Sequence, residues 1–265
     1  GFRVLAGCRA YLLPHQISAV ARCFETSPVR YMLADEVGLG KTVESCAILS
    51  ILASENKDLR VLIIVPGALV SQWKNELHYK YGLDASVASA LSRICLLPLE
   101  DVGKSISILY SKWDLAIVDE THRLLANDDW YNHIQALSRR VTHILLLSAT
   151  PIQDRNEEYR RLLALLNPEQ YEDMSPERFA WMVKRQKKIQ RSANLLLGYL
   201  ERYDEYTEIV IDDLNTIVET LEDPALEKMV KEIDLTSEDK GLGKVKQALS
   251  YICENYRIER KVIRN

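Results

Sequence analysis

The stretch from Leu33 to Thr42 carries residue types that bind phosphate groups in proteins. It reads Leu-Ala-Asp-Glu-Val-Gly-Leu-Gly-Lys-Thr, and an apolar run leads into it. Gly38 and Gly40 let the backbone turn so that successive amide N–H groups point at phosphate oxygens. Lys41 would then reach the β and γ phosphates of a nucleotide, and the Thr42 hydroxyl would bind Mg²⁺. The stretch therefore predicts a nucleotide-binding loop between a strand and a helix.

One position departs from the general pattern of such loops. The pattern has glycine five residues before Gly40, where this chain has Asp35. A glycine turn before an ordinary helix, with a surface lysine, is therefore the alternative. Two other segments, 103–105 and 241–244, have residues similar to the end of this loop. Neither follows an apolar strand, so both are predicted to be loops.

Two adjacent carboxylates, Asp119 and Glu120, follow the apolar run 115–118. Mg²⁺ prefers oxygen ligands and keeps several waters, so Asp119 would suffice to hold it together with Thr42. Glu120 would orient and deprotonate a water that attacks the phosphate. Adjacent acids also begin many solvated loops, which is the alternative. Their position after a strand, in a chain that also has the loop, favours the catalytic interpretation.

These residues need a sheet to bring them together. The expected strands are 31–34, 61–65, 93–97, 115–118 and 144–147, and helical patterns such as 68–80 alternate with them. Alternating strands and helices predict an α/β fold with a parallel sheet that is covered on both faces. Ligands of such sheets bind at the carboxyl ends of the strands. Asp35, Pro66, Asp119 and Ser148 all fall at such ends, so we expect one shared site.

Composition limits the remaining possibilities. The chain has 265 residues, 47% of them hydrophobic, and a net charge of −4. Residues 201–240 contain 14 acidic and 4 basic side chains, so the rest of the chain is net basic and nucleic acid is not excluded as a partner. The stretch 178–191 predicts an amphipathic helix with a basic outer face, either solvated or in contact with phosphates.

The five cysteines are scattered along the sequence and indicate neither disulfides nor zinc. The sequence also has no membrane-spanning run and no signal peptide. We therefore expect a cytoplasmic protein.

Four motifs in order resemble the first motor lobe of the Swi/Snf-family ATPases, a branch of helicase superfamily two. They are the loop through Glu44, the segment from Val65 to Trp73, Val118-Asp-Glu-Thr-His122, and Leu147-Ser-Ala-Thr-Pro-Ile-Gln-Asp-Arg155. Similarity is greatest to bacterial members, such as the RNA-polymerase-recycling ATPase and phage-defence motors. The family usually has Asp-Glu where the general loop has glycine, which accounts for Asp35.

The resemblance implies roles for individual residues. It makes ATP and Mg²⁺ the expected ligands of the loop, through Asp35, Glu36, Gly38, Leu39, Gly40, Lys41, Thr42 and Val43. Gln16 matches the glutamine that reads the adenine edge, and an exposed polar helix residue is the alternative. Double-stranded DNA is the expected partner along the segment that contains Pro66 and Ser71. The residues expected to couple the ATP site to the DNA are His122, Ser148 and Thr150.

Three features differ from the family pattern. Thr121 replaces the usual alanine between glutamate and histidine. The interval from Trp73 to Asp119 is short, which would reduce a sheet element or a DNA-facing loop. Pro98 stands where a hydroxyl residue usually follows the strand, so that DNA contact is not expected here.

The resemblance also divides the chain. It implies a RecA-like ATP-binding lobe at residues 1–167 and a helical extension at 168–257, with helices at 195–203, 224–233 and 242–256. The start of a return to a second RecA-like lobe, absent from this chain, is expected at 258–265. The second lobe supplies arginines, so the chain alone should bind nucleotide but hydrolyse it poorly. The intact protein is expected to translocate on double-stranded DNA, with RNA polymerase or defence-system proteins as possible partners. The alternatives are a strand-separating helicase, a restriction-type motor, and a non-catalytic nucleic-acid or protein-binding module.

Overall fold

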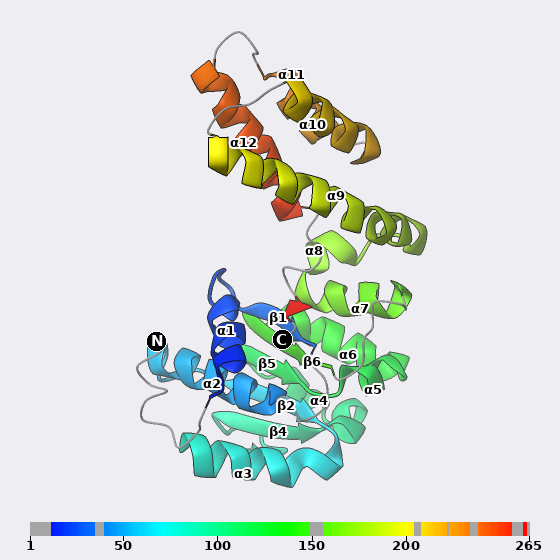
Figure 1. Ribbon diagram of the computed structural model, residues 1–265. Coiled ribbons are helices and arrows are strands. Elements are labelled where there is room, and N and C mark those ends of the chain that lie inside the picture. Colours follow the sequence, from blue (N-terminus) through cyan, green and yellow to red (C-terminus); the bar gives the residue numbers. More distant parts are fainter. Residues whose placement is uncertain are drawn as a thin grey trace. The chain divides into compact units, whose positions relative to one another are not determined.

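A single parallel sheet organises the N-terminal part of the chain. The computed structural model describes residues 12–34, 40–148, 156–203, 208–221, 223–233, 238–255 and 262–263. Seven strands of these residues form the sheet, in the order β3-β4-β2-β5-β6-β1-β7 (Figure 1). All neighbouring strands run parallel. Their bounds are β1 Arg30–Leu33, β2 Val61–Val65, β3 Ser86–Val87, β4 Ile94–Pro98, β5 Leu115–Val118, β6 His143–Leu147 and β7 Val262–Ile263.

The predicted α/β fold with a mostly parallel sheet is confirmed. All five expected strands are present, and two of them have the predicted bounds. β3 and β7 are additional strands of two residues each, too short to give a recognisable apolar run. The helices before residue 175 are α1 Pro14–Cys23, α2 Lys41–Glu55, α3 Val70–Tyr81, α4 Ile106–Leu109, α5 Thr121–Leu125, α6 Asp128–Ser138, α7 Asn156–Leu166 and α8 Pro168–Tyr171.

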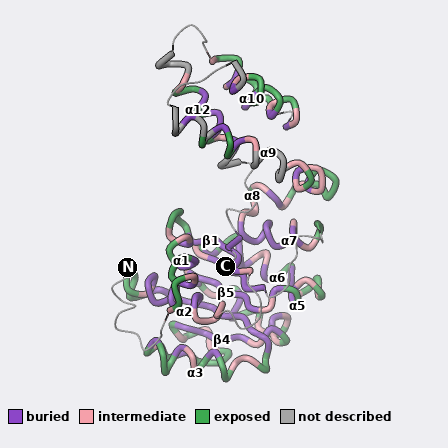
Figure 2. Tube along the Cα trace, viewed as in Figure 1, coloured by how far each residue is buried: buried purple, intermediate pink, exposed green. Residues whose placement is uncertain are grey.

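Central strands such as β4 and β5 are buried along almost their whole length, as Figure 2 shows. In the strands other than β3, which is exposed, alternate residues join one apolar cluster with side chains of α1, α2 and α3. In β5 these residues are Leu115 and Ile117. The strand residues between them, such as Ala116 and Val118, are equally buried and face the other way. On that side α7 packs against β1. The sheet therefore lies between two helical layers.

Arg30, the first residue of β1, connects the amino edge of the sheet to the ends of α6 and α7. Its guanidinium donates to the carbonyl oxygens of Ser138 and Val141 at 2.9 Å. It also donates to those of Leu165 and Leu166 at 2.8 Å. Carbonyls at a helix end have no partner within the helix, so Arg30 satisfies groups that would otherwise be left without donors.

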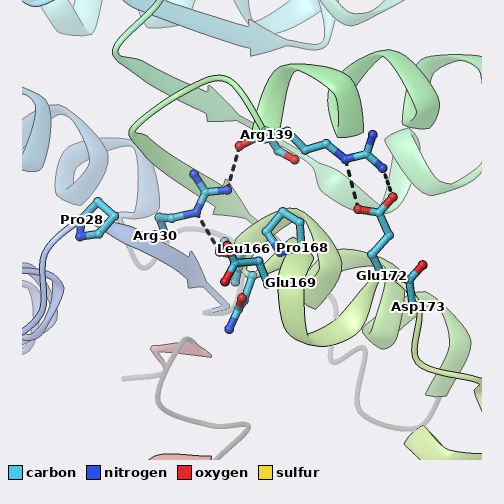
Figure 3. Close-up of a pocket in the computed structure, with 10 residues that line it drawn as sticks. Pro28, Arg30, Arg139, Leu166, Pro168, Glu169, Glu172 and Asp173 are labelled. Atoms are coloured by element: carbon cyan, nitrogen blue, oxygen red, sulfur yellow. Dashed lines mark hydrogen bonds and ion pairs between the residues drawn. The ribbon is translucent and has the colours of Figure 1, made fainter.

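A cavity of about 650 Å³ opens beside Arg30 (Figure 3). Arg139 and Glu172 form an ion pair at its wall, in which Arg139 Nε donates to Glu172 Oε2 at 3.1 Å. The guanidinium of Arg30 is directed at backbone carbonyls. The charged groups of Arg30, Arg139 and Glu172 therefore all contact other groups of the first unit. The cavity lies at the edge of the sheet opposite to the predicted site.

The chain divides into two compact units, Gly1–Met174 with Lys261–Asn265, and Ser175–Arg260. The first unit ends a few residues after the expected boundary at 167, because α8 packs on α7. The second unit is helical, with α9 Pro176–Tyr203, α10 Glu208–Leu221, α11 Pro224–Lys231 and α12 Glu238–Asn255. These helices share an apolar core.

The sequence interpretation of the second unit was partly wrong. The stretch 178–191 and the predicted helix 195–203 belong to one helix, α9. Helix α10 was not predicted. The segment 241–244, predicted as a loop, lies within α12. The segment 103–105 was also predicted as a loop, and its first two residues belong to a 3₁₀ turn, Leu99–Lys104.

Candidate functional site

The carboxyl ends of the central strands lie level with one another. Leu33 of β1 pairs with Leu147 of β6, and Val118 of β5 pairs with Leu146 of β6 and Ile64 of β2. Backbone hydrogen bonds extend this register past the strands, because Ser148 N–H donates to the Leu33 carbonyl at 3.0 Å. The residues that follow β1, β2, β5 and β6 therefore meet at one edge of the sheet.

The predicted phosphate-binding loop stands in the sequence between β1 and α2, at this edge. Gly40 has φ +97°, in the left-handed region that glycine adopts without strain, and α2 begins at Lys41. The Glu44 N–H donates to the Gly40 carbonyl at 2.9 Å and closes the first turn. Lys41 and Thr42 are both partly exposed at the positive end of this helix. Asp35, Glu36, Gly38 and Leu39 lie outside the described residues.

Gln16 packs directly against this loop. Its Oε1 accepts the Leu13 N–H at 2.9 Å, which caps α1. A Cβ atom at Gly40 would lie 2.1 Å from Gln16 Nε2, so a side chain there would displace the Gln16 amide and would also be strained by the φ of +97°. The alternative of an exposed helix residue is wrong, because Gln16 is 5% exposed. That Gln16 reads the adenine stays a prediction.

Asp119 directly follows β5, and both of its carboxylate oxygens accept hydrogen bonds. Trp73 Nε1 of α3 donates to Oδ2 at 2.8 Å, and the Glu120 N–H donates to Oδ1 at 2.8 Å. Asp119 is buried, and this burial raises the pKa of its carboxyl group. The two hydrogen bonds and the Lys41 ammonium oppose the rise. The carboxylate therefore lies near Lys41, and its charge is stabilised by donors rather than by solvent.

Glu120 has a backbone conformation that is uncommon for its residue type. Its φ of +49° lies in the left-handed region, which disfavours residues with a side chain. Such strain is concentrated at functional sites. Glu120 Oε2 is buried and accepts no hydrogen bond among the described residues, although His122 Nδ1 lies 3.1 Å away, within ion-pair distance. A buried carboxylate oxygen with unused acceptor capacity can accept a proton from water.

The residues present fit a magnesium ion bound with a nucleotide. Thr42 supplies a hydroxyl and Asp119 a carboxylate, both hard oxygen ligands. Each Asp119 oxygen accepts one hydrogen bond within the protein and retains another lone pair. No group of three or more His, Cys, Asp or Glu side chains in the described part of the chain could hold a metal. Such a group is not required, because phosphates and waters complete the coordination of Mg²⁺ in nucleotide sites.

The residues predicted to face DNA or to couple it to the ATP site differ in exposure. Ser71 and His122 are exposed, whereas Pro66 and Ser148 are buried. Thr150 lies outside the described residues. The Gly67 N–H, beside Pro66, donates to Glu100 Oε2 at 2.9 Å, and Arg123 Nη2 donates to Oε1 of the same carboxylate at 3.3 Å.

Two contacts at the site were missed by the sequence analysis. Trp73 was named only as the last residue of one motif, and Glu100 was not singled out. Trp73 and Asp119 are 46 residues apart, and Gly67 and Glu100 are 33 apart. The alternation of side chains along β5 could have indicated the contact between Trp73 and Asp119. Leu115 and Ile117 face the layer that contains α3, so Asp119, two residues after Ile117, is expected to face α3 as well.

The fold and this edge of the sheet define a nucleotide-binding α/β lobe of the RecA-like kind. The model of the SNF2-related domain matches residues 15–242, and the chain therefore belongs to this family. The predicted first lobe of a Swi/Snf-family, superfamily-two protein is confirmed at the level of family and fold.

Bacterial relatives and a solved archaeal structure agree with this assignment. The chain is 29% identical over 284 residues to the RNA polymerase-associated protein RapA of Yersinia pseudotuberculosis serotype O:1b (strain IP 31758). RapA of Yersinia pestis (strain Pestoides F) is 28% identical. Each match covers 98% of this chain but 28% of the relative. The Sulfolobus solfataricus SWI2/SNF2 ATPase core in complex with dsDNA shares the fold, with a TM-score of 0.58, 16% identity, and coverage of 95% of this chain and 66% of that chain.

No helix in the part of the chain that the structure describes is long and apolar enough to cross a membrane.

Proposed function

We propose that this chain is the ATP-binding first lobe of a DNA-dependent ATPase that translocates on double-stranded DNA. The observation that carries the proposal is the convergence of Gly40, Lys41 and Thr42 with Asp119 and Glu120 at one edge of the sheet. Only β6 separates β1 from β5 in the strand order. A phosphate group bound at the start of α2 would therefore lie within reach of both carboxylates.

Each residue has a role that follows from its environment. Lys41 binds the β and γ phosphates, and the helix start at Gly40 directs backbone N–H groups toward them. Thr42 and Asp119 would hold Mg²⁺, which would supply positive charge to offset the negative charge of the transferring phosphate. Glu120 orients the attacking water and takes its proton, because its Oε2 atom is buried close to the edge where the phosphate binds.

The adenine end of ATP is proposed to lie beside α1. Gln16 is fixed against Gly40 by its own capping bond to Leu13, so its amide is preorganised next to the loop. We propose, on the family pattern, that the nucleotide site is completed by the loop residues Asp35, Glu36, Gly38 and Leu39 together with Val43 of α2.

Duplex DNA is proposed to bind across the segment after β2. Ser71 is exposed there, and His122 is exposed after β5. Ser148 and Thr150 would connect this track to the nucleotide, with Pro66 shaping the turn after β2. The solved neighbour is a complex with dsDNA, which supports double-stranded DNA as a partner of this chain. The bacterial relatives are RNA polymerase-associated, which makes RNA polymerase a second candidate partner. Phosphate contacts of this kind bind DNA without reading its sequence.

A second lobe is proposed to complete the catalytic site. This chain spans 28% of the length of its curated relatives. Its described residues build one parallel sheet. In such motors a second lobe supplies arginines to the transition state.

The test is ATP turnover by the whole protein that contains this chain, with and without duplex DNA. We expect duplex DNA to stimulate turnover, and Glu120→Gln to abolish turnover while ATP binding is kept. Glu55→Gln is the matched control, because it makes the same change at the end of α2 remote from the loop. Negligible turnover in every sample, despite ATP binding, would support a non-catalytic binding module instead. ATP-dependent strand displacement would support a helicase.

A further inference from the structure

The indole of Trp73 forms a buried hydrogen bond that a purely apolar core residue would not form. Trp73 is 1% exposed and Asp119 is 6% exposed, and 2.8 Å separates Nε1 from Oδ2. With the Glu120 N–H on Oδ1, each carboxylate oxygen has one fixed donor. Rotation of the Asp119 carboxylate would break both bonds. Its orientation is therefore set before any ligand binds.

A second buried tryptophan shows what packing alone requires. Trp113 is 3% exposed, and its Nε1 donates to the backbone carbonyl of Ile108 at 2.7 Å. A buried indole N–H needs an acceptor, and a carbonyl satisfies that need. Trp73 instead uses the carboxylate at the end of β5, the strand that leads into the acidic pair. A hydrogen bond to a charged acceptor is also stronger than one to a neutral carbonyl.

Helix α3, which carries Trp73, contacts the nucleotide site at a second point. Tyr81 OH, at the other end of α3, donates to the carbonyl of Val43 in the first turn of α2 at 2.8 Å. Ser71 on the same helix is exposed at the proposed DNA track. One rigid helix therefore touches both the carboxylate and the helix that follows the phosphate-binding loop.

We propose that Trp73 is a positioning residue for Asp119, whose indole N–H holds the carboxylate in the orientation that meets Mg²⁺ and ties that orientation to α3. This inference rests on the proposed function, because it assumes that Asp119 meets a nucleotide-bound metal. Trp73→Phe removes the donor on Oδ2 and leaves the carboxylate held only by the Glu120 N–H on Oδ1. The expected effect is a loss of roughly 10-fold to 100-fold in Mg²⁺ affinity, the usual cost of removing a residue that orients a metal ligand.

The test compares nucleotide binding by this chain with Mg²⁺ and with excess EDTA. The wild type should bind ATP more tightly with Mg²⁺, and Trp73→Phe should lose most of that gain while its EDTA affinity stays within about twofold of wild type. Electron paramagnetic resonance of Mn²⁺ with bound ATP gives a direct readout of the metal. Trp113→Phe removes an indole donor that is also buried but lies away from the site, and its ATP affinity should still increase with Mg²⁺ as in the wild type.

Shape can be separated from hydrogen bonding by a second substitution. Benzothienylalanine at position 73 keeps the bicyclic ring but replaces N–H by sulfur. If Mg²⁺ no longer increases the ATP affinity of this variant, the proposal is supported even if Trp73→Phe fails to fold. If Mg²⁺ still increases its ATP affinity, or if Trp113→Phe loses the increase equally, the proposal is overturned and the proposed function is left intact. A wild type that binds no nucleotide under either condition would contradict the proposed function itself.

Discussion

Arg30 is the residue whose contacts reach furthest through the first unit. Its five guanidinium N–H groups are directed at carbonyls of α6, α7 and the turn before β6. Lysine has three donors without planar geometry, so Arg30→Lys would leave at least two carbonyls unsatisfied. We expect a loss of about 2–3 kcal/mol in the free energy of unfolding, measured by urea denaturation. Arg139→Lys, in a partly exposed ion pair, should cost at most about 1 kcal/mol, and equal losses would contradict this account.

His143 gives the first unit a pH dependence at its amino edge. The Val29 N–H donates to His143 Nδ1 at 3.1 Å, which requires that this nitrogen carry no proton. Burial lowers the pKa of His143 below 6.5; the Arg30 cation adds to this, while Asp114 and Glu55 oppose it. The unfolded chain therefore binds the proton first as the pH falls. Stability should be constant above the unfolded pKa and should decrease from about pH 6.5 down to the folded pKa.

The substitution His143→Asn tests the cause of this pH dependence. Its side-chain oxygen can accept the Val29 N–H but does not titrate. Unfolding in urea between pH 5 and pH 8 should show a shallower pH dependence for the variant than for the wild type. The same slope in both proteins would assign the effect to other groups.

At the scale of elements, the 3₁₀ turn after β4 places a negative charge beside the proposed DNA track. Glu100 accepts hydrogen bonds from Gly67 and Arg123, donors that a DNA phosphate could use instead. Glu100→Gln keeps an acceptor but removes the charge. We expect duplex DNA affinity to rise severalfold at low ionic strength, with the gain shrinking as salt is added. DNA affinity is measured by fluorescence anisotropy, and Asp101→Asn, the same change one residue along, should have a smaller effect. An unchanged DNA affinity for Glu100→Gln would contradict the location of Glu100 beside the DNA.

Elements were predictable from the sequence where a residue pattern repeats. The runs of β2 and β5 are apolar throughout because both sheet faces are buried, so their bounds could be read directly. β7 has only two residues and is defined by pairing with β1, not by any pattern of its own. The segment 241–244 has two glycines, yet Val245 and Leu249 of the same helix are buried in the core of the second unit. That tertiary packing outweighs the low helix propensity of glycine.

The candidate site was predictable to the same extent. Lys41 and Thr42 lie in one short motif, and strand order brings Asp119 to them. The contacts of Trp73 and Glu100 depend on how α3 and the 3₁₀ turn are rotated against the sheet. No local spacing encodes that rotation. Sequence patterns therefore identified the residues proposed for chemistry, but not those that hold them in place.

At the scale of the whole molecule, the proposed mechanism needs more than this chain. The described residues form one sheet, with one edge proposed to bind phosphate, and the chain spans 28% of the length of its curated relatives. Arginines supplied by a second lobe are worth about 10³ to 10⁵ in rate in phosphoryl transfer. We therefore expect this chain to bind Mg²⁺ and ATP but to hydrolyse ATP at least about 10³-fold more slowly than the whole protein on duplex DNA.

Single-turnover hydrolysis of labelled ATP, with chain in excess, separates binding from chemistry. Lys41→Ala should abolish binding, because the ammonium group that meets the phosphates is lost. Glu120→Gln should leave binding intact, and its residual hydrolysis should be little below that of the wild-type chain, since a base contributes little where the transition-state charge is not stabilised. Hydrolysis by this chain within tenfold of the whole protein would mean that the described edge of the sheet is catalytically sufficient. The proposed division of labour between two lobes would then be wrong.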